Sequence, residues 1–135
     1  MSSKQQRIEV IKRAGKLLSD RKKWIRGVLA SRAVGRGKTI SHLGMTSVPP
    51  LHPDAKSFCA LGALRKCAFE IESDKQRAED LLIDVEYDVN CAIAKGDPTE
   101  DVQRIHAIND DKSPAARRRV LAAFCDAIRK LEKKK

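Results

Sequence analysis

Four residues between positions 52 and 109 supply the side chains that a cysteine hydrolase uses: Cys59, His52, His106 and Asn109. In such an enzyme the thiolate attacks the substrate, the histidine moves the proton and a third polar group orients the imidazole. A reactive cysteine needs a lowered pKa, which a helix N-terminus or a cationic neighbour provides. The helix predicted around Cys59 begins at Pro53, and apolar residues flank the cysteine. The sequence therefore favours a buried core thiol and no enzymatic activity, with a hydrolase centred on Cys59 as the alternative.

Lysine and arginine side chains offer a second chemistry, the binding of phosphates. The formal net charge is +10, and residues 1–38 hold twelve basic residues against two acidic ones. Cations that neutralise phosphates release counterions, which gives sequence-independent and salt-sensitive affinity, and an aromatic ring can stack on a base. The candidate nucleic-acid-binding residues are Lys12, Arg13, Lys16, Arg21, Lys22, Lys23, Trp24, Arg26, Arg32, Arg36, Lys38, Arg117, Arg118 and Arg119.

The middle of the chain has the opposite charge, and it leaves two other interpretations open. Residues 70–101 carry eleven acidic residues against three basic ones, and Asp80, Asp84 and Asp88 recur every four residues. On a helix this spacing forms a like-charged stripe. The stripe could pair with the basic segment inside the fold, or it could bind a protein partner, as in an adaptor. No helix-turn-helix, zinc-finger or RNA-recognition motif accompanies the basic residues.

Metal and nucleotide sites are not predicted, and neither is a cofactor. Cys59 and Cys67 are eight residues apart on one predicted helix, about two turns, too far to bind one ion together. The Gly-Lys-Thr at 37–39 lacks the glycine that a phosphate-binding loop has five residues earlier, because Arg32 stands there.

Hydrophobic periodicity predicts one mainly α-helical domain of about five helices. The predicted elements are a basic amphipathic helix at 4–18, a core helix at 53–70, an acidic helix at 74–95, a short helix at 98–108 and a C-terminal helix at 114–131. Ser73 is the predicted cap of the acidic helix, and Gly96 its end. Glycines at 35 and 37 favour a short β-hairpin within residues 24–40, and Asn109-Asp110 is predicted to form a turn.

Gly62 stands in the middle of the apolar stretch Phe58–Leu64. Glycine inside a helix costs about 1 kcal/mol relative to alanine. A close approach of another element to the helix backbone would explain why glycine stands there, so we predict such a contact at Gly62.

The order of several motifs resembles a family of small uncharacterised bacterial and phage proteins, a domain of unknown function. The motifs are Trp24-x-x-Gly27, the stretch Phe-Cys-Ala-Leu-Gly-Ala-Leu at 58–64, and Asn109-Asp110 followed by an amphipathic helix. The resemblance spans roughly residues 5–130, and the apolar stretch is its most specific part. Members carry cysteine directly after the tryptophan, whereas this chain has Ile25. The resemblance implies the layout of the chain and a setting in phage–host interplay, and it brings no activity.

The chain is thus predicted to be a small, non-enzymatic binding protein whose basic N-terminal surface engages nucleic acid or a nucleoprotein complex. A protein partner is the further alternative. The apolar runs are too short for a transmembrane helix, and the N-terminus lacks a secretory signal. Four cysteines without an export signal are expected to be reduced thiols. These features predict a cytoplasmic protein that does not bind membranes.

Overall fold

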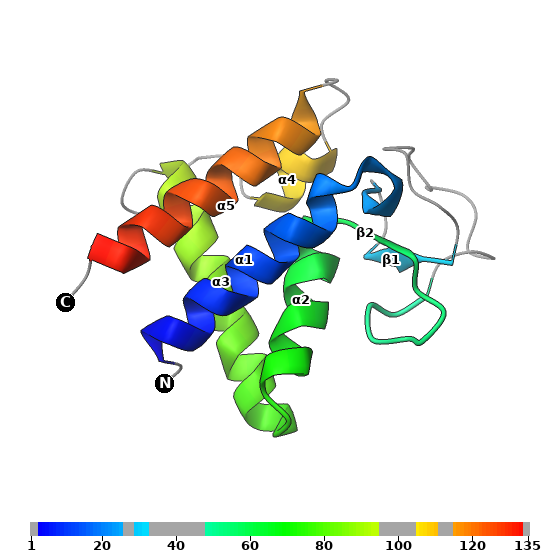
Figure 1. Cartoon of the computed structure of the whole chain (residues 1–135), viewed down its shortest axis with the longest axis horizontal. Coiled ribbons are helices and arrows are strands. Elements are labelled where there is room, and N and C mark those ends of the chain that lie inside the picture. The colour runs from blue at the N-terminus through cyan, green and yellow to red at the C-terminus, as the bar shows by residue number, and fades with distance from the viewer. Residues whose placement is uncertain (1–2, 26–28, 33–47, 95–104, 111–114, 134–135) are drawn as a thin grey trace.

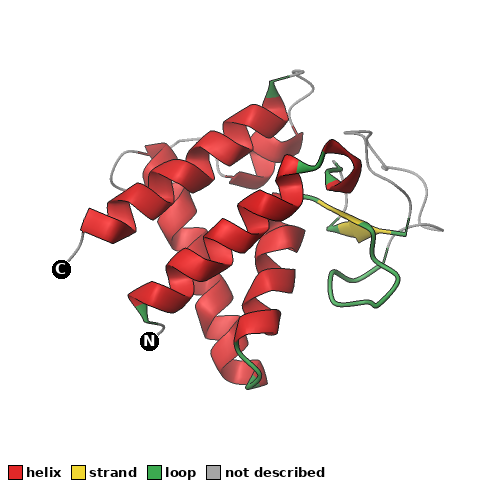
Figure 2. Cartoon of the chain, in the orientation of Figure 1, coloured by secondary structure: helices red, strands yellow, loops and turns green. Residues whose placement is uncertain are grey.

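The computed structural model describes residues 3–25, 29–32, 48–94, 105–110 and 115–133. Within these ranges five α-helices and a two-stranded sheet follow one another along the chain (Figure 1). Their bounds are α1 Lys4–Ser19, the 3₁₀-helix η1 Arg21–Lys23, β1 Ala30–Ser31, β2 Ser57–Phe58, α2 Ala60–Ile71, α3 Lys75–Ala94, α4 Ile105–Asp110 and α5 Ala116–Lys133. Helices make up most of the described chain (Figure 2), so the predicted mainly helical, single-domain fold is confirmed.

α1 begins with a capping box. The Ser3 hydroxyl accepts a hydrogen bond from the backbone N–H of Gln6, and the Gln6 side chain accepts one from the backbone N–H of Ser3. The helix packs against α2 and α5. Gly15 faces α5, where an added Cβ would lie 3.7 Å from the Phe124 ring. The buried residues of the helix are Ile8, Val10, Ile11, Ala14 and Leu18.

α2 begins at Ala60, so the predicted start at Pro53 is wrong. The reason lies in the backbone hydrogen bonds of the preceding residues. The N–H of Lys56 donates to a carbonyl of β1 (2.8 Å), and the N–H of Cys59 donates to the Leu29 carbonyl (3.1 Å). These donors pair with a segment distant in sequence, and residues 53–59 therefore form turns and a short strand instead of helix.

The sheet joins two segments that are distant in the sequence. β1 and β2 run antiparallel, with Ala30 opposite Phe58 and Ser31 opposite Ser57. The strand at 30–31 falls inside the predicted hairpin, but its partner is the segment that periodicity assigns to the core helix. The predicted returning strand at 39–40 lies outside the described residues.

Gly62 allows this sheet to approach α2. An added Cβ at Gly62 would lie 1.9 Å from the carbonyl oxygen of Leu29 and 2.8 Å from its carbonyl carbon. Both are backbone atoms that cannot rotate out of the way. The predicted close approach at Gly62 is confirmed.

The start of α3 differs from the prediction by one residue. Asp74, and not Ser73, acts as the cap, because the Asp74 carboxylate accepts a hydrogen bond from the backbone N–H of Arg77 (2.9 Å). The helix is described as far as Ala94, and the predicted end at Gly96 lies outside the described residues.

α4 and α5 also shift relative to their predicted ranges of 98–108 and 114–131. α4 spans Ile105–Asp110, so the predicted turn at Asn109-Asp110 is instead the end of this helix. α5 starts at Ala116 and continues to Lys133. Residues 98–104 and 111–114 lie outside the described part of the chain.

The core is formed mainly by aliphatic side chains between the helices. Phe58 and Phe124 are the largest of the fully buried side chains. α1 and α3 are linked by an ion pair between Arg7 and Asp88, whose carboxylate is almost fully buried. In the described ranges no helix combines the length and apolarity that crossing a membrane requires.

Candidate nucleic-acid interface

Basic side chains line the exposed side of α1 and continue into η1. Lys12 and Lys16 are one turn apart and exposed, and η1 adds the exposed side chains Arg21–Lys23. Asp20 fixes the start of η1, because its carboxylate accepts a hydrogen bond from the backbone N–H of Lys22 (3.0 Å). The local sequence therefore presents these cations at the C-terminal end of α1.

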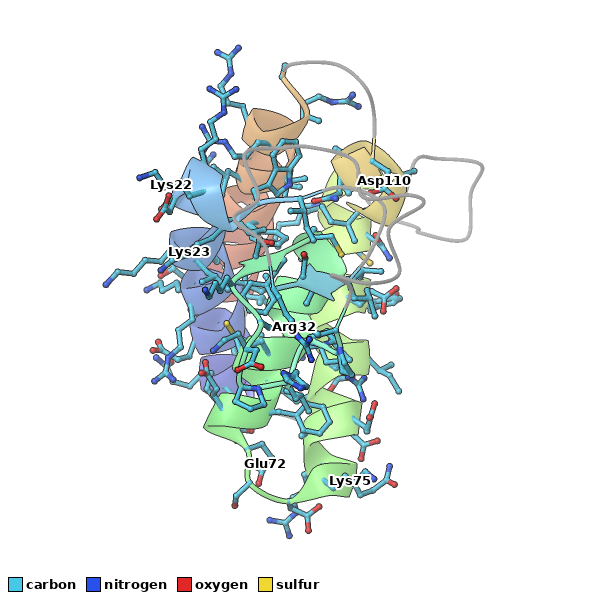
Figure 3. The ribbon with its side chains drawn as sticks, turned by 90° about the vertical axis from the view of Figure 1, so that its right-hand side faces the viewer. Lys22, Lys23, Arg32, Glu72, Lys75 and Asp110 are labelled. Atoms are coloured by element: carbon cyan, nitrogen blue, oxygen red, sulfur yellow. The ribbon has the colours of Figure 1, made fainter. Side chains whose placement is uncertain are left out.

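Arg117 brings the start of α5 to the same end of the molecule. Its Nη1 donates to the Ser19 carbonyl (3.0 Å) and the Leu18 carbonyl (3.5 Å) in the last turn of α1. A guanidinium at this position also suits the negative end of the helix dipole. Arg118 and Arg119 follow and are exposed. Figure 3 shows Lys22 and Lys23 near the upper end of the molecule, where α5 begins.

We call the set Lys12, Lys16, Arg21, Lys22, Lys23, Arg117, Arg118 and Arg119 the basic face. Within the described ranges no carboxylate lies within ion-pair distance of Lys12, Lys16, Arg21, Lys22, Lys23 or Arg118. Most of the charge of the basic face is therefore directed to solvent.

The acidic stripe of α3 meets a basic residue inside the fold, and that residue is not on the basic face. Asp88 forms an ion pair with Arg7. The hydrogen bond from the Arg7 guanidinium to the Asp88 carboxylate raises the pKa of Arg7 above its usual value, and the negative charge of Asp84 raises it by a smaller amount. Asp80 instead accepts a hydrogen bond from Gln76 (3.1 Å). Internal pairing therefore occurs between α1 and α3, but it uses a residue at the start of α1.

Not every predicted residue joins the basic face. Arg13 forms an ion pair with Glu9 on the same helix (3.0 Å). Arg32 lies beside the sheet, 3.9 Å from a carboxylate oxygen of Asp54, and is well separated from Lys22 and Lys23 in Figure 3. The predicted residues Arg26, Arg36 and Lys38 lie outside the described part of the chain.

Trp24 is not available to stack on a base, which corrects the prediction. Its side chain is 4% exposed, and its indole Nε1 donates to the Asn109 side-chain oxygen (2.7 Å). The same oxygen accepts from the backbone N–H of Ala60 (2.9 Å), at the start of α2. The Asn109 amide nitrogen donates to the Ile25 carbonyl (3.0 Å) and to the Asp110 carboxylate (3.1 Å). We call Asn109, Trp24, Ile25 and Ala60 the Asn109 network.

The Asn109 network joins the three motifs on which the family resemblance rests. Asn109 is fully buried, and its amide makes four hydrogen bonds to segments 49 to 85 residues away and to its neighbour Asp110. The sequence predicts a local turn at Asn109, because spacing along the chain indicates hydrogen-bond partners among neighbouring residues and not among distant ones. The shared motif order was the sequence feature that pointed to these residues as a group.

Cys59 occupies the N-cap of α2, and its sulfur accepts a hydrogen bond from the backbone N–H of Gly62 (3.4 Å). A helix that began at Pro53 would have left Cys59 beyond its first turn, whereas Cys59 lies at the N-terminus, where the helix lowers a thiol pKa. Burial nevertheless dominates and raises the pKa of Cys59 to about 11. The thiol therefore stays protonated at neutral pH, as expected of a core cysteine.

Two of the three other residues of the alternative hydrolase site have described side chains, and both are engaged in other hydrogen bonds. His52 accepts a hydrogen bond from the backbone N–H of Asp54 (3.0 Å), and Asn109 is committed to its network. His106 is in α4, and its side chain lies outside what the structure describes.

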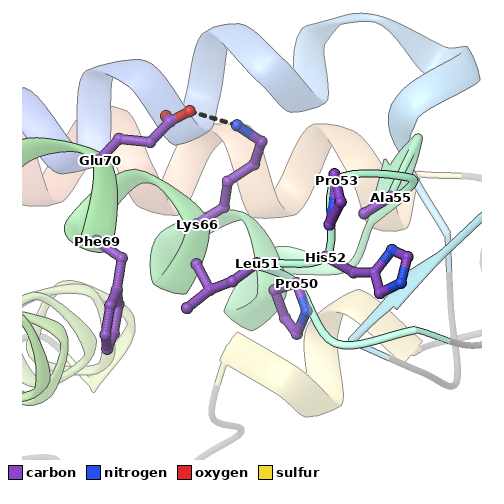
Figure 4. Close-up of a pocket in the computed structure, with 8 residues that line it drawn as sticks. All are labelled: Pro50, Leu51, His52, Pro53, Ala55, Lys66, Phe69 and Glu70. Atoms are coloured by element: carbon purple, nitrogen blue, oxygen red, sulfur yellow. Dashed lines mark hydrogen bonds and ion pairs between the residues drawn. The ribbon is translucent and has the colours of Figure 1, made fainter. Parts of the chain in front are cut away.

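His52 lines a pocket of about 230 Å³ between the loop before β2 and α2. Figure 4 shows the Lys66–Glu70 ion pair at its edge. Neither Cys59 nor any residue of the basic face contributes to the pocket, whose lining residues are Pro50, Leu51, His52, Pro53, Ala55, Lys66, Phe69 and Glu70.

Among the residues that the structure describes, no three histidine, cysteine, aspartate or glutamate side chains come together in a way that could hold a metal ion.

Comparison with known proteins gives one match. The model of a family of unknown function, DUF6197, matches residues 2–130. No curated protein and no solved structure matches the chain. The match covers nearly the whole chain, including every residue of the Asn109 network and of the basic face. The chain belongs to the family of unknown function DUF6197.

Proposed function

We propose that this protein is a non-enzymatic binding protein that holds nucleic acid, free or in a nucleoprotein complex, on its basic face. The observation that carries the proposal is the Arg117 contact with the end of α1, which brings two basic segments about a hundred residues apart onto one surface. Exposed cations without carboxylate partners in the described ranges are the groups that neutralise phosphates.

The composition of the basic face indicates which part of the nucleic acid it contacts. All five aromatic residues of the chain are described, and none belongs to the basic face. Lysine and arginine without a stacking ring bind the phosphate backbone and do not read bases. We therefore expect duplexes of different base composition to bind with equal affinity.

The test is a titration of the whole protein with a fluorescent DNA duplex of about 20 base pairs between about 50 and 200 mM salt. Contacts with about five phosphates predict a slope of log affinity against log salt near −4 to −5. Replacing Lys22→Glu together with Lys23→Glu should weaken binding by at least about tenfold at low salt, because two attractions become repulsions.

The matched control is Lys75→Glu with Arg77→Glu, which changes the net charge by the same amount at the far end of the molecule. Figure 3 shows Lys75 at the opposite end from Lys22 and Lys23. The control should bind within about twofold of the wild type once both are compared at about 150 mM salt, where long-range effects are screened. Equal losses in the two variants, or no wild-type binding at 50 mM salt, would refute the proposal.

The cytoplasmic location and the setting in phage–host interplay stay predictions of the sequence. The proposal depends on neither, because it concerns the chemistry of the basic face.

A further inference from the structure

A second exposed surface lies on α3 and differs from the basic face in chemistry. Ile83 is 63% exposed and Tyr87 is 56% exposed. They are four residues apart, so they lie on the same side of the helix. The two other large apolar residues that are exposed in the described ranges, Leu29 and Leu51, lie outside α3, in the segments before β1 and before β2. Aromatic residues such as tyrosine are enriched at the centre of protein interfaces.

Carboxylates surround this apolar pair. Helical geometry places Asp80 and Asp84 on one side of Ile83 and Tyr87, and Glu86 on the other. Asp80 is exposed, while Asp84 and Glu86 are half-buried. We call Asp80, Ile83, Asp84, Glu86 and Tyr87 the α3 patch. Asp88 is not part of it, because it is buried against Arg7.

The α3 patch and the basic face belong to different sides of the molecule. Figure 3 shows α1 on the left of the molecule and α3 on the right, with the Arg7–Asp88 ion pair linking the two helices. A nucleic acid on the basic face would therefore leave α3 accessible. Phosphates would be repelled by the carboxylates of the α3 patch. Two copies of the patch facing each other would also place like charges opposite one another.

We infer that the α3 patch docks a basic amphipathic helix of a partner protein. The apolar side of that helix covers Ile83 and Tyr87, which removes their exposed surface from water. Its lysine or arginine side chains face Asp80, Asp84 and Glu86, which supplies the charge complementarity that selects this partner over an acidic one. The inference stands apart from the proposed function, because none of the five patch residues belongs to the basic face.

The test uses three synthetic helical peptides of about 18 residues, or five turns. The first carries leucines along one side and lysines elsewhere. The second has glutamates in place of the lysines, and the third has serines in place of the leucines. Each is titrated into the isotope-labelled full-length protein while backbone amide signals are followed by NMR. Only the first should bind, and the amides that shift should cluster around residues 80–87.

Variants inside and outside the α3 patch test whether the peptide binds there. Ile83→Ser with Tyr87→Ser should weaken binding of the first peptide by about tenfold or more, whereas Leu29→Ser with Leu51→Ser should leave it unchanged. Lys22→Glu with Lys23→Glu should also leave it unchanged, which separates this site from the basic face. Failure of the first peptide to bind, equal binding of the serine peptide, shifts centred elsewhere, or an unchanged affinity in Ile83→Ser with Tyr87→Ser would each overturn the inference.

Discussion

The side chain of Asn109 connects three segments of the chain through a single amide. Its oxygen accepts from the Trp24 indole and from the first backbone N–H of α2, and its nitrogen donates to the Ile25 carbonyl. Buried polar groups without partners are costly, and a fully satisfied network specifies one arrangement of the surrounding elements. At the scale of single residues, Asn109 positions the start of α2 relative to the segment that leads out of η1.

Asn109→Ala should therefore destabilise the fold strongly. The substitution leaves the Trp24 indole N–H, the Ala60 N–H and the Ile25 carbonyl without their buried partner. We expect a loss of about 3 kcal/mol or more in the free energy of unfolding, measured by urea denaturation. Asn90→Ala is the matched control, because within the described ranges buried Asn90 accepts one hydrogen bond, from the backbone N–H of Ile105. It should cost about 1–2 kcal/mol, and equal losses would contradict the role given to Asn109.

The four cysteines should react with a thiol reagent in an order set by burial and pKa. Cys125 is exposed, Cys91 is half-buried, and Cys59 and Cys67 are buried. Burial raises the pKa of Cys59 to about 11 and that of Cys67 to about 12, so neither forms a thiolate at neutral pH. Iodoacetamide labelling at pH 7, followed by mass spectrometry, should modify Cys125 first. Denatured protein, in which all four thiols react alike, is the control. Fast labelling of Cys59 in the folded protein would instead support the alternative of a hydrolase centred on Cys59.

At the scale of elements, two helical glycines should respond to alanine with opposite signs. In α2, a methyl group at Gly62 would meet the backbone of Leu29 at 1.9 Å. Gly62→Ala should cost about 3 kcal/mol or more in the free energy of unfolding, because the sheet must move away from α2. In α1, a methyl group at Gly15 would lie 3.7 Å from Phe124, an ordinary contact. Gly15→Ala should stabilise the protein by up to about 1 kcal/mol. Urea denaturation measures both, and a stabilising Gly62→Ala would refute the close approach.

The sequence predicted those elements that depend on interactions between residues close together in the chain. Apolar spacing placed α1 within one residue of its observed end, and the missing Cβ of Gly62 indicated the close approach. It misplaced the start of α2 because the N–H groups of Lys56 and Cys59 bond to residues 29–31, and no local pattern shows that pairing. The strand at 30–31 falls within the predicted hairpin segment, but its pairing with residues 57–58 likewise has no local signal.

The candidate site was predictable to a similar degree. The sequence shows which residues are basic. It does not show that Arg117 donates hydrogen bonds to two carbonyls of α1, and this tertiary contact places Arg117 on the basic face. A tryptophan can be a stacking ring or a core residue. Trp24 is a core residue because its indole N–H donates to the buried side chain of Asn109.

At the scale of the whole molecule, opposite charges lie on different surfaces. The basic face combines the end of α1, η1 and the start of α5, whereas α3 carries the acidic residues. An ion pair between Arg7 and Asp88 joins α1 to α3. Such an arrangement orients the protein on a polyanion, because α3 is repelled while the basic face is attracted.

The central claim is that two distant segments of the chain form one nucleic-acid-binding surface, and α5 offers the most direct test. Arg118 and Arg129 are both exposed and lie eleven residues apart on the same side of this helix, about 16 Å along its axis. Only Arg118 belongs to the basic face.

The measurement is the affinity of Arg118→Glu and Arg129→Glu for the same DNA duplex, with circular dichroism to confirm that both variants fold. Both substitutions change the net charge equally. Arg118→Glu should weaken binding by about fivefold or more, as a reversed phosphate contact does, and Arg129→Glu by less than about twofold. Equal losses would show that only the net charge matters, and an unchanged affinity of Arg118→Glu would show that α5 takes no part in the surface.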